Sequence, residues 1–148
     1  MKQNTEVAEL LVSYSPHVVS AQKISNSRET YSLITNYWNL DTIEMLEEVK
    51  VILLNKANKV LGIFDLSKGG ICSSIIDVKI VLSIALKTLA SGIIIIHNHP
   101  SGDLSPSKAD IDITEKLKSV CKIMDIMLLD HVIISQQDYY SFADDGLL

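Results

Sequence analysis

Four consecutive isoleucines, residues 93–96, constrain the fold of this chain more than any other feature of its sequence. Isoleucine is β-branched and favours strands, and a short apolar run without polar alternation is typical of a strand that is covered on both faces. Ser91 and Gly92 precede the run, and His97 follows it directly. The sequence therefore predicts a central strand in a sheet that lies between other layers.

The flanking patterns predict helices and a hairpin around this strand. Tyr31, Ile34 and Trp38 recur at helical spacing, which predicts a helix over residues 28–39 with Ser27 as its N-cap. The other expected elements are strands over 49–54 and 60–66 joined by a polar turn at 55–58, a short strand over 71–76, a helix from an Asp77 N-cap to about residue 90, a helix over about 107–121, and strands near 126–135 and 139–142. This order predicts an α/β fold, a mixed β-sheet with flanking helices.

Composition bounds the class of protein. The chain has 148 residues, 47% of them hydrophobic, and a net charge of -5, values that indicate one globular domain and exclude a disordered chain. The apolar run is far too short to cross a bilayer, and the first residues, MKQNTEVAELL, show no secretory signal, so we expect no membrane association. Cys72 and Cys121 lie far apart without CxxC spacing, which indicates a reducing compartment, and we expect the cytoplasm.

The segment after the isoleucines, HNHPSGDLSPSKAD at residues 97–110, contains residue types that bind metals. Alternate residues of an extended chain project to one side, so His97 and His99 can present two imidazoles to one ion. The Gly and Pro residues of the loop permit a sharp turn, and Asp110 follows in the first turn of the next helix. Two His and one carboxylate leave a fourth position for water, as in catalytic zinc sites. We predict a Zn²⁺ site formed by His97, His99 and Asp110.

The same residues have plainer interpretations. Two histidines at this spacing are by themselves a weak sign of a metal site. Ser107 and Asp110 also match a capping-box pattern that does no more than start a helix. The capping and ligand roles of Asp110 are compatible, because the cap fixes the helix that carries the ligand. The combination of a buried strand, paired histidines, a turn and a helix start favours the metal site.

These motifs resemble the RadC family, through HNHPSG, PSKADIDITEKLK, LLDHVIIS and YYSFADDG. RadC proteins belong to the JAB/MPN class of zinc metallopeptidase-like domains, whose JAMM motif is an upstream Glu, then His-x-His, then Ser-x-x-Asp. The resemblance implies zinc ligation by His97, His99 and Asp110, a role for Ser107 in supporting the transition state, and a cytidine-deaminase-like fold. It implies a JAB/MPN domain over residues 28–148, behind an N-terminal extension at 1–27 that is too short for the helix-hairpin-helix segment of full-length relatives.

The resemblance also implies a general base. The family's Glu is expected on the strand that follows the hairpin turn, but residues 59–70 contain no Glu, and Asp65 is the carboxylate there. We therefore predict Asp65 as the catalytic base and as the carboxylate nearest the metal after the ligands. Because Asp is one methylene shorter than Glu, we expect low peptidase activity. Glu44, Glu47 and Glu48 precede the first hairpin strand and are expected on a solvated face.

Three functions remain open at this point. The resemblance implies a zinc hydrolase that cleaves an amide or isopeptide bond in a peptide or an isopeptide-linked protein. A DNA-associated protein follows from the family's repair label, although 18 acidic against 13 basic residues predict weak, salt-sensitive DNA binding. A non-catalytic MPN-like scaffold is the third. A zinc deaminase is disfavoured because the H-x-E and P-C-x-x-C signatures are absent from the sequence.

Overall fold

A five-stranded mixed sheet forms the centre of the molecule, as seen in a computed structural model that describes residues 7, 8, 10–15, 21–69 and 76–148. The strands are β1 (Glu48–Leu54), β2 (Val60–Lys68), β3 (Gly92–Asn98), β4 (Met127–Ile134) and β5 (Tyr139–Ser141), in the spatial order β2-β1-β3-β4-β5. The pair β3 and β4 is parallel, whereas the other neighbours are antiparallel. The α/β class and the mixed sheet predicted from the sequence are thus confirmed. The short strand expected over 71–76 falls on a segment of which residues 71–75 lie outside the described residues.

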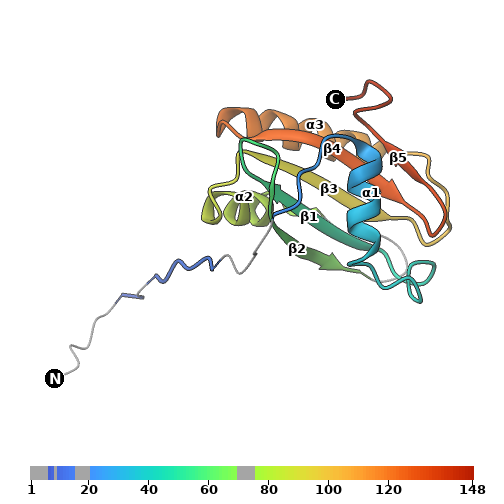
Figure 1. The fold of residues 1–148 in the computed structure, drawn as a ribbon, viewed down its shortest axis with the longest axis horizontal. Coiled ribbons are helices and arrows are strands. Elements are labelled where there is room, and N and C mark those ends of the chain that lie inside the picture. The colour runs from blue at the N-terminus through green and yellow to red at the C-terminus, as the bar shows by residue number, and fades with distance from the viewer. Residues whose placement is uncertain (1–6, 9, 16–20, 70–75) are drawn as a thin grey trace.

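Three helices cover the two faces of this sheet (Figure 1). Helix α1 (Ser27–Thr35) packs on one face, where its buried Leu33 and Ile34 join a core that includes Ile94 and Ile96 of β3. Helices α2 (Val78–Lys87) and α3 (Lys108–Ile123) pack on the other face. Within the described part of the chain, no helix combines the length and the hydropathy needed to cross a bilayer.

The helix boundaries follow from local capping. The N-cap of α1 is Asn26 rather than Ser27, because the Asn26 side chain accepts the hydrogen bond from the Glu29 backbone N–H. This helix ends at Thr35, earlier than expected, and Trp38 is buried beyond its end. Asp77 caps α2 as predicted.

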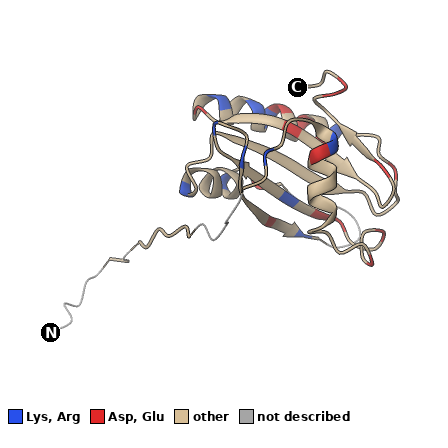
Figure 2. Cartoon of the chain, viewed as in Figure 1, with Lys and Arg blue, Asp and Glu red and all other residues tan. Residues whose placement is uncertain are grey.

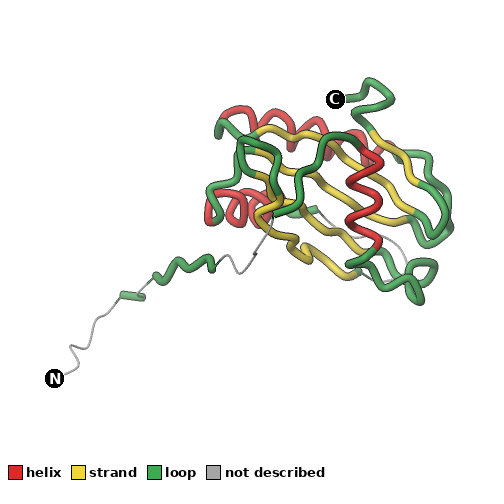
Figure 3. The backbone as a smooth tube through the Cα atoms, viewed as in Figure 1, coloured by secondary structure: helices red, strands yellow, loops and turns green. Residues whose placement is uncertain are grey.

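The central strand β3 is buried along its whole length, as the isoleucine run predicts. Ile93 and Ile95 face α2 and α3, whereas Ile94 and Ile96 face α1. The alternation continues into the next two residues, so His97 belongs to the α2/α3 side and Asn98 to the α1 side. The loop that follows, residues 99–107, connects this strand to α3 (Figure 3).

Charged residues of the described chain lie mostly on helices and loops (Figure 2). Lysines and acidic residues are interspersed along α3, whose sequence is KADIDITEKLKSVCKI. This helix therefore presents a surface of mixed charge instead of a stripe of one sign.

Candidate metal centre

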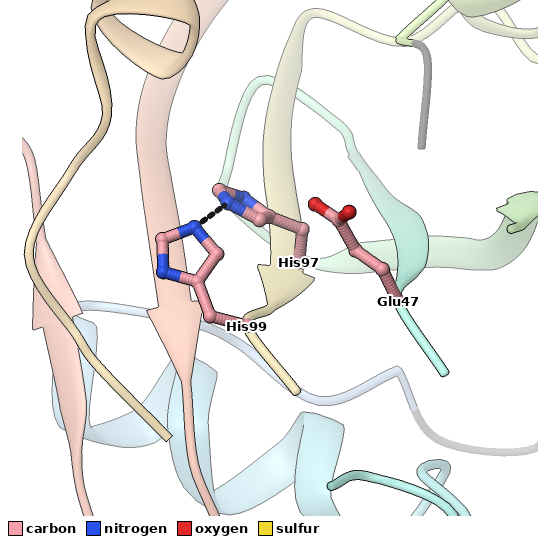
Figure 4. Close-up of side chains that lie close together, drawn as sticks. All are labelled: Glu47, His97 and His99. Carbon is pink, nitrogen blue, oxygen red and sulfur yellow. Dashed lines mark hydrogen bonds between the residues drawn. The ribbon is translucent and has the colours of Figure 1, made fainter. Parts of the chain in front are cut away.

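Two imidazoles converge at the end of the central strand (Figure 4). His97 lies within β3 and is 2% exposed, and His99 follows the strand directly. Their Nε2 atoms are 2.9 Å apart. The period-two alternation of the extended chain therefore brings both rings to one point, as the sequence pattern predicts.

Asp110 completes a cluster of three side chains. Its Oδ1 lies 3.3 Å from Nε2 of His97, and its Oδ2 lies 3.3 Å from Nε2 of His99. A capping box fixes this carboxylate: the Ser107 backbone N–H donates to Asp110 Oδ2 at 2.7 Å, and the Asp110 N–H donates to Ser107 Oγ at 3.1 Å. The helix cap and the candidate ligand are thus the same residue, and the cap aims the carboxylate at the two rings.

Glu47 also faces this cluster. Ligand atoms of Glu47, His97 and His99 all lie within 4.8 Å of one another, and Figure 4 shows the Glu47 carboxylate turned towards His97. The register of the sheet explains this position. Val49 of β1 is the cross-strand partner of His97, and Glu47 precedes Val49 by two residues, so it projects to the same side.

The expectation of a solvated face for the glutamates before β1 was wrong at two of three positions. Glu44 is exposed, but Glu47 is partly buried at the cluster. Glu48 is 5% exposed and pairs with Lys50 at 3.7 Å and with Lys68 at 3.3 Å. The physical reason is that β1 is buried on both faces, because its side chains alternate between the two hydrophobic cores on either side of the sheet. The signal that sequence reasoning missed was the alternation that links Glu47 to the buried Val49.

Asp65 lies on the opposite face of the sheet. It is the cross-strand partner of Lys50, whose ammonium group donates to its carboxylate, and its side chain is 78% exposed. Lys50 sits 5.0 Å from the ring centre of Trp38, which belongs to the core on the α1 side, whereas His97 faces α2 and α3. Asp65 is therefore not the carboxylate nearest the candidate ligands, and its expected position beside the metal was wrong.

Hydrogen bonds orient both rings with Nε2 towards the cluster. His99 Nδ1 is 2.6 Å from the Asp103 carbonyl, which can only accept, so Nδ1 carries a hydrogen and Nε2 is the nitrogen that faces the cluster. On the buried side, His97 Nδ1 is 2.8 Å from Nε2 of His131. A backbone carbonyl on the outer ring nitrogen, as at His99, is typical of metal-binding histidines.

The electrostatics of the cluster match a cation site. Burial raises the pKa of Asp110, but hydrogen bonds from His97 and His99 outweigh it and hold that pKa well below its ordinary value. The carboxylate of Asp110 in turn raises the pKa of His99. Both shifts show that the carboxylate stabilises positive charge between the three side chains.

The donor atoms fit zinc in type and lie close together. Ligands at 2.0–2.1 Å around a tetrahedral ion are separated by about 3.3 Å. Oδ1 and Oδ2 of Asp110 lie 3.3 Å from Nε2 of His97 and of His99, respectively, and the two Nε2 atoms are 2.9 Å apart. Imidazole nitrogen and carboxylate oxygen are both common zinc ligands. The three side chains therefore form a donor set that suits a zinc ion and leaves a further position open.

Asn98, between the two histidines, holds the segment that carries Glu47. Its Oδ1 accepts from the Glu48 N–H at 2.8 Å, and its Nδ2 donates to the carbonyls of Ile43 at 2.6 Å and Leu46 at 2.8 Å. The Asn98 side chain is fully buried. The motif His-Asn-His thus places the two candidate ligands on one side of β3. From the other side, its Asn98 holds the acidic segment in place.

This fold and site define a class of α/β domain with a candidate metal centre at the end of its central strand. The family model described as the RadC-like JAB domain matches residues 24–147. The chain belongs to this family. The N-terminal extension over residues 1–27 stays a prediction.

Proteins from several bacteria are similar to this chain in sequence. A protein of Flavobacterium johnsoniae is 42% identical over 132 residues, which cover 88% of this chain and 56% of the relative. Proteins of Thermotoga maritima and Clostridium perfringens are 45% identical over 102 residues and 37% identical over 144 residues, covering 69% and 96% of this chain and 46% and 61% of those relatives. All three carry the name UPF0758 protein, which states no activity, and the chain spans little more than half the length of the first curated relatives it matches.

We predict that Asn98→Leu loosens the segment before β1. The change leaves the Glu48 N–H and the carbonyls of Ile43 and Leu46 unpaired in the interior, so the free energy of unfolding should fall by about 3 kcal/mol or more. Urea unfolding measures this loss, and amide hydrogen exchange should become faster over residues 43–48. Asn36→Leu is the matched control, because its Nδ2 bonds a carbonyl, that of Ser32, at the exposed end of α1. Equal stabilities of the two variants would contradict the role of Asn98.

Proposed function

We propose that this chain is a zinc-dependent hydrolase of the RadC type that cleaves an amide or isopeptide bond in a peptide or protein substrate. The observation that carries the proposal is the convergence of two carboxylates, Glu47 and Asp110, on His97 and His99. This set provides, in the same chain order, the upstream Glu, His-x-His and Asp of the JAMM motif. With Glu47 in this position, Asp65 need not replace the Glu of the family. The low activity that was expected from such a replacement therefore no longer follows.

In this proposal His97, His99 and Asp110 hold the ion. Zinc bound there supplies a Lewis acid that polarises a carbonyl and lowers the pKa of a coordinated water towards about 7. The partners of both rings at Nδ1 leave Nε2 facing the position of the ion, so each ring can offer the Nε2 lone pair, once any proton on it is released, without a rearrangement at Nδ1. Asp110 offsets part of the added positive charge.

Glu47 acts as the general base and acid. Its carboxylate takes a proton from the attacking water and passes it to the amine that leaves, a transfer that requires a group within hydrogen-bond reach of the reacting atoms. Ser107 is placed beside the Asp110 carboxylate. Its hydroxyl oxygen accepts from the Asp110 N–H, so the hydroxyl hydrogen is available for the oxyanion of the substrate.

We predict one zinc per chain. Elemental analysis of protein purified without chelators and supplied with zinc should give about one equivalent, and His99→Ala should lose most of it because one of three ligands is removed. His17→Ala is the control, since no role at the cluster is expected for this histidine. A wild-type protein that stays free of metal would overturn the site assignment.

Zinc affinity should also depend on pH. Zinc competes with a proton for Nε2 of His99, whose pKa is raised in the metal-free protein first by its hydrogen bond to Asp110. The proton is therefore held at a higher pH than in an ordinary His, and the affinity should fall as pH decreases through that raised pKa. Competition titrations with a chromophoric chelator between about pH 8 and about pH 6 measure this, with a slope of about one decade per pH unit for each proton displaced. An affinity that is constant over this range would show that His99 is not a ligand.

Glu47→Gln separates catalysis from metal binding. Gln has nearly the same shape but cannot accept the proton, so hydrolysis should fall by about 10²–10⁴-fold while zinc content stays unchanged. A library of fluorogenic peptides and isopeptide-linked conjugates, read by fluorescence and mass spectrometry, provides the assay. Asp65→Asn is the matched control and should keep full activity, because Asp65 lies on the other face of the sheet.

Two outcomes would change the proposal. Loss of activity in Asp65→Asn with retention in Glu47→Gln would contradict the assignment of the base. Zinc binding without hydrolysis of any conjugate by the wild-type protein would favour the non-catalytic scaffold.

A further inference from the structure

His131 is a buried imidazole that the proposed hydrolysis does not use directly. It lies in the middle of β4, beside Ile95 of β3 in the parallel register, and is 0% exposed. Phe142 stacks on its ring, with centroids 4.6 Å apart and planes inclined by 12°. Both ring nitrogens contact polar atoms: Nε2 is 2.8 Å from His97 Nδ1, and Nδ1 is 2.6 Å from the hydroxyl of Thr114.

The direction of these hydrogen bonds can be derived from Thr114. Its hydroxyl donates to the backbone carbonyl of Asp110 at 2.6 Å, and a carbonyl can only accept. The single hydroxyl hydrogen is then used, so the contact with His131 requires the hydroxyl oxygen to accept from Nδ1–H. The opposite direction would leave two oxygens 2.6 Å apart without a hydrogen between them.

The direction of the hydrogen bond between His131 and His97 follows from the number of hydrogens on the His131 ring. The ring of His131 is 0% exposed and stacked on Phe142, and an interior position of this kind disfavours the charged form of an imidazole, so the ring carries one hydrogen. With that hydrogen on Nδ1, Nε2 of His131 has a lone pair and accepts from Nδ1–H of His97. Nε2 of His97 is then the nitrogen that faces His99 and Asp110, and its lone pair is the one that a bound cation would use.

An imidazole acceptor differs from the usual partner of a metal-binding histidine. A carboxylate or a backbone carbonyl accepts in every state relevant here, as Asp103 does for His99. An imidazole nitrogen accepts in only one of its two neutral tautomers. His131 can therefore orient His97 only if something fixes its own tautomer, and Thr114 is the group in position to do so.

We propose that Thr114 and His131 are positioning residues that hold His97 in the tautomer whose Nε2 lone pair faces the metal. The inference rests on the proposed metal binding by His97, His99 and Asp110. The same chain of bonds starts at the Asp110 carbonyl on α3 and ends at His97 on β3, so it connects two ligands from different elements. Thr114 belongs to the turn of α3 that follows Asp110, which explains how the helix reaches both.

Variants of Thr114 test the relay through metal affinity. Thr114→Val keeps the shape of the side chain but removes the hydroxyl, so zinc affinity in a chelator competition should fall by about 10–100-fold. Thr114→Ser restores the hydroxyl and should bind zinc within about threefold of wild type. Thr35→Val is the matched control: its hydroxyl also donates to the carbonyl four residues earlier, Tyr31 at 3.0 Å in α1, but it has no imidazole partner among the described residues. Wild-type affinity in Thr114→Val would overturn the relay.

Nitrogen-15 NMR of the histidine rings tests the tautomers without metal and without catalysis. In the metal-free wild type His131 should carry its hydrogen on Nδ1, and in Thr114→Val a population with the hydrogen on Nε2 should appear. A wild-type His131 with its hydrogen on Nε2 would refute the relay even if Thr114→Val fails to fold. The two proposals fail separately: a wild type that binds no zinc removes the hydrolase, whereas equal zinc affinities of wild type and Thr114→Val remove only the relay.

Discussion

The site depends on one constraint, the burial of both faces of β3. A strand covered on two sides must alternate its side chains between two interiors, and in this chain the alternation does not stop where the isoleucines end. His97 therefore enters the interior under α2 and α3, and Asn98 enters the one under α1. Polar groups placed in such interiors require partners, and the partners they find are the rest of the site.

Features of local origin could be predicted from the sequence. The isoleucine run indicates a central strand, the His-x-His spacing indicates two rings on one side, and Ser107 with Asp110 indicates a helix start, because each depends on residues close together in the chain. Deviations at helix ends are of the same local kind: Asn26 competes with Ser27 for the N-cap, and either is a good capping residue.

The position of Glu47 could not be derived in the same way, because it depends on the pairing of two strands that are distant in sequence. A one-residue slip in register turns every side chain to the other face, and the β1/β2 ladder itself shifts register between Val49 and Lys50. The sequence therefore predicted the base on the second hairpin strand, at Asp65, which in the structure faces Lys50. Only the pairing of Val49 with His97 shows that the segment before the first strand brings a glutamate to the histidines.

The two networks on either side of β3 have different consequences for function. On one side, hydrogen bonds run from the Asp110 carbonyl through Thr114 and His131 to Nδ1 of His97, and in our proposal they set which nitrogen of His97 is offered to a cation. On the other side, the three bonds of Asn98 determine where the segment before β1 lies, and so they control the aim of Glu47. Because the sheet separates these networks, a substitution in one should leave the hydrogen bonds of the other largely intact. Three consecutive residues thus place the two candidate ligands on one face of β3 and hold the segment of Glu47 from the other face.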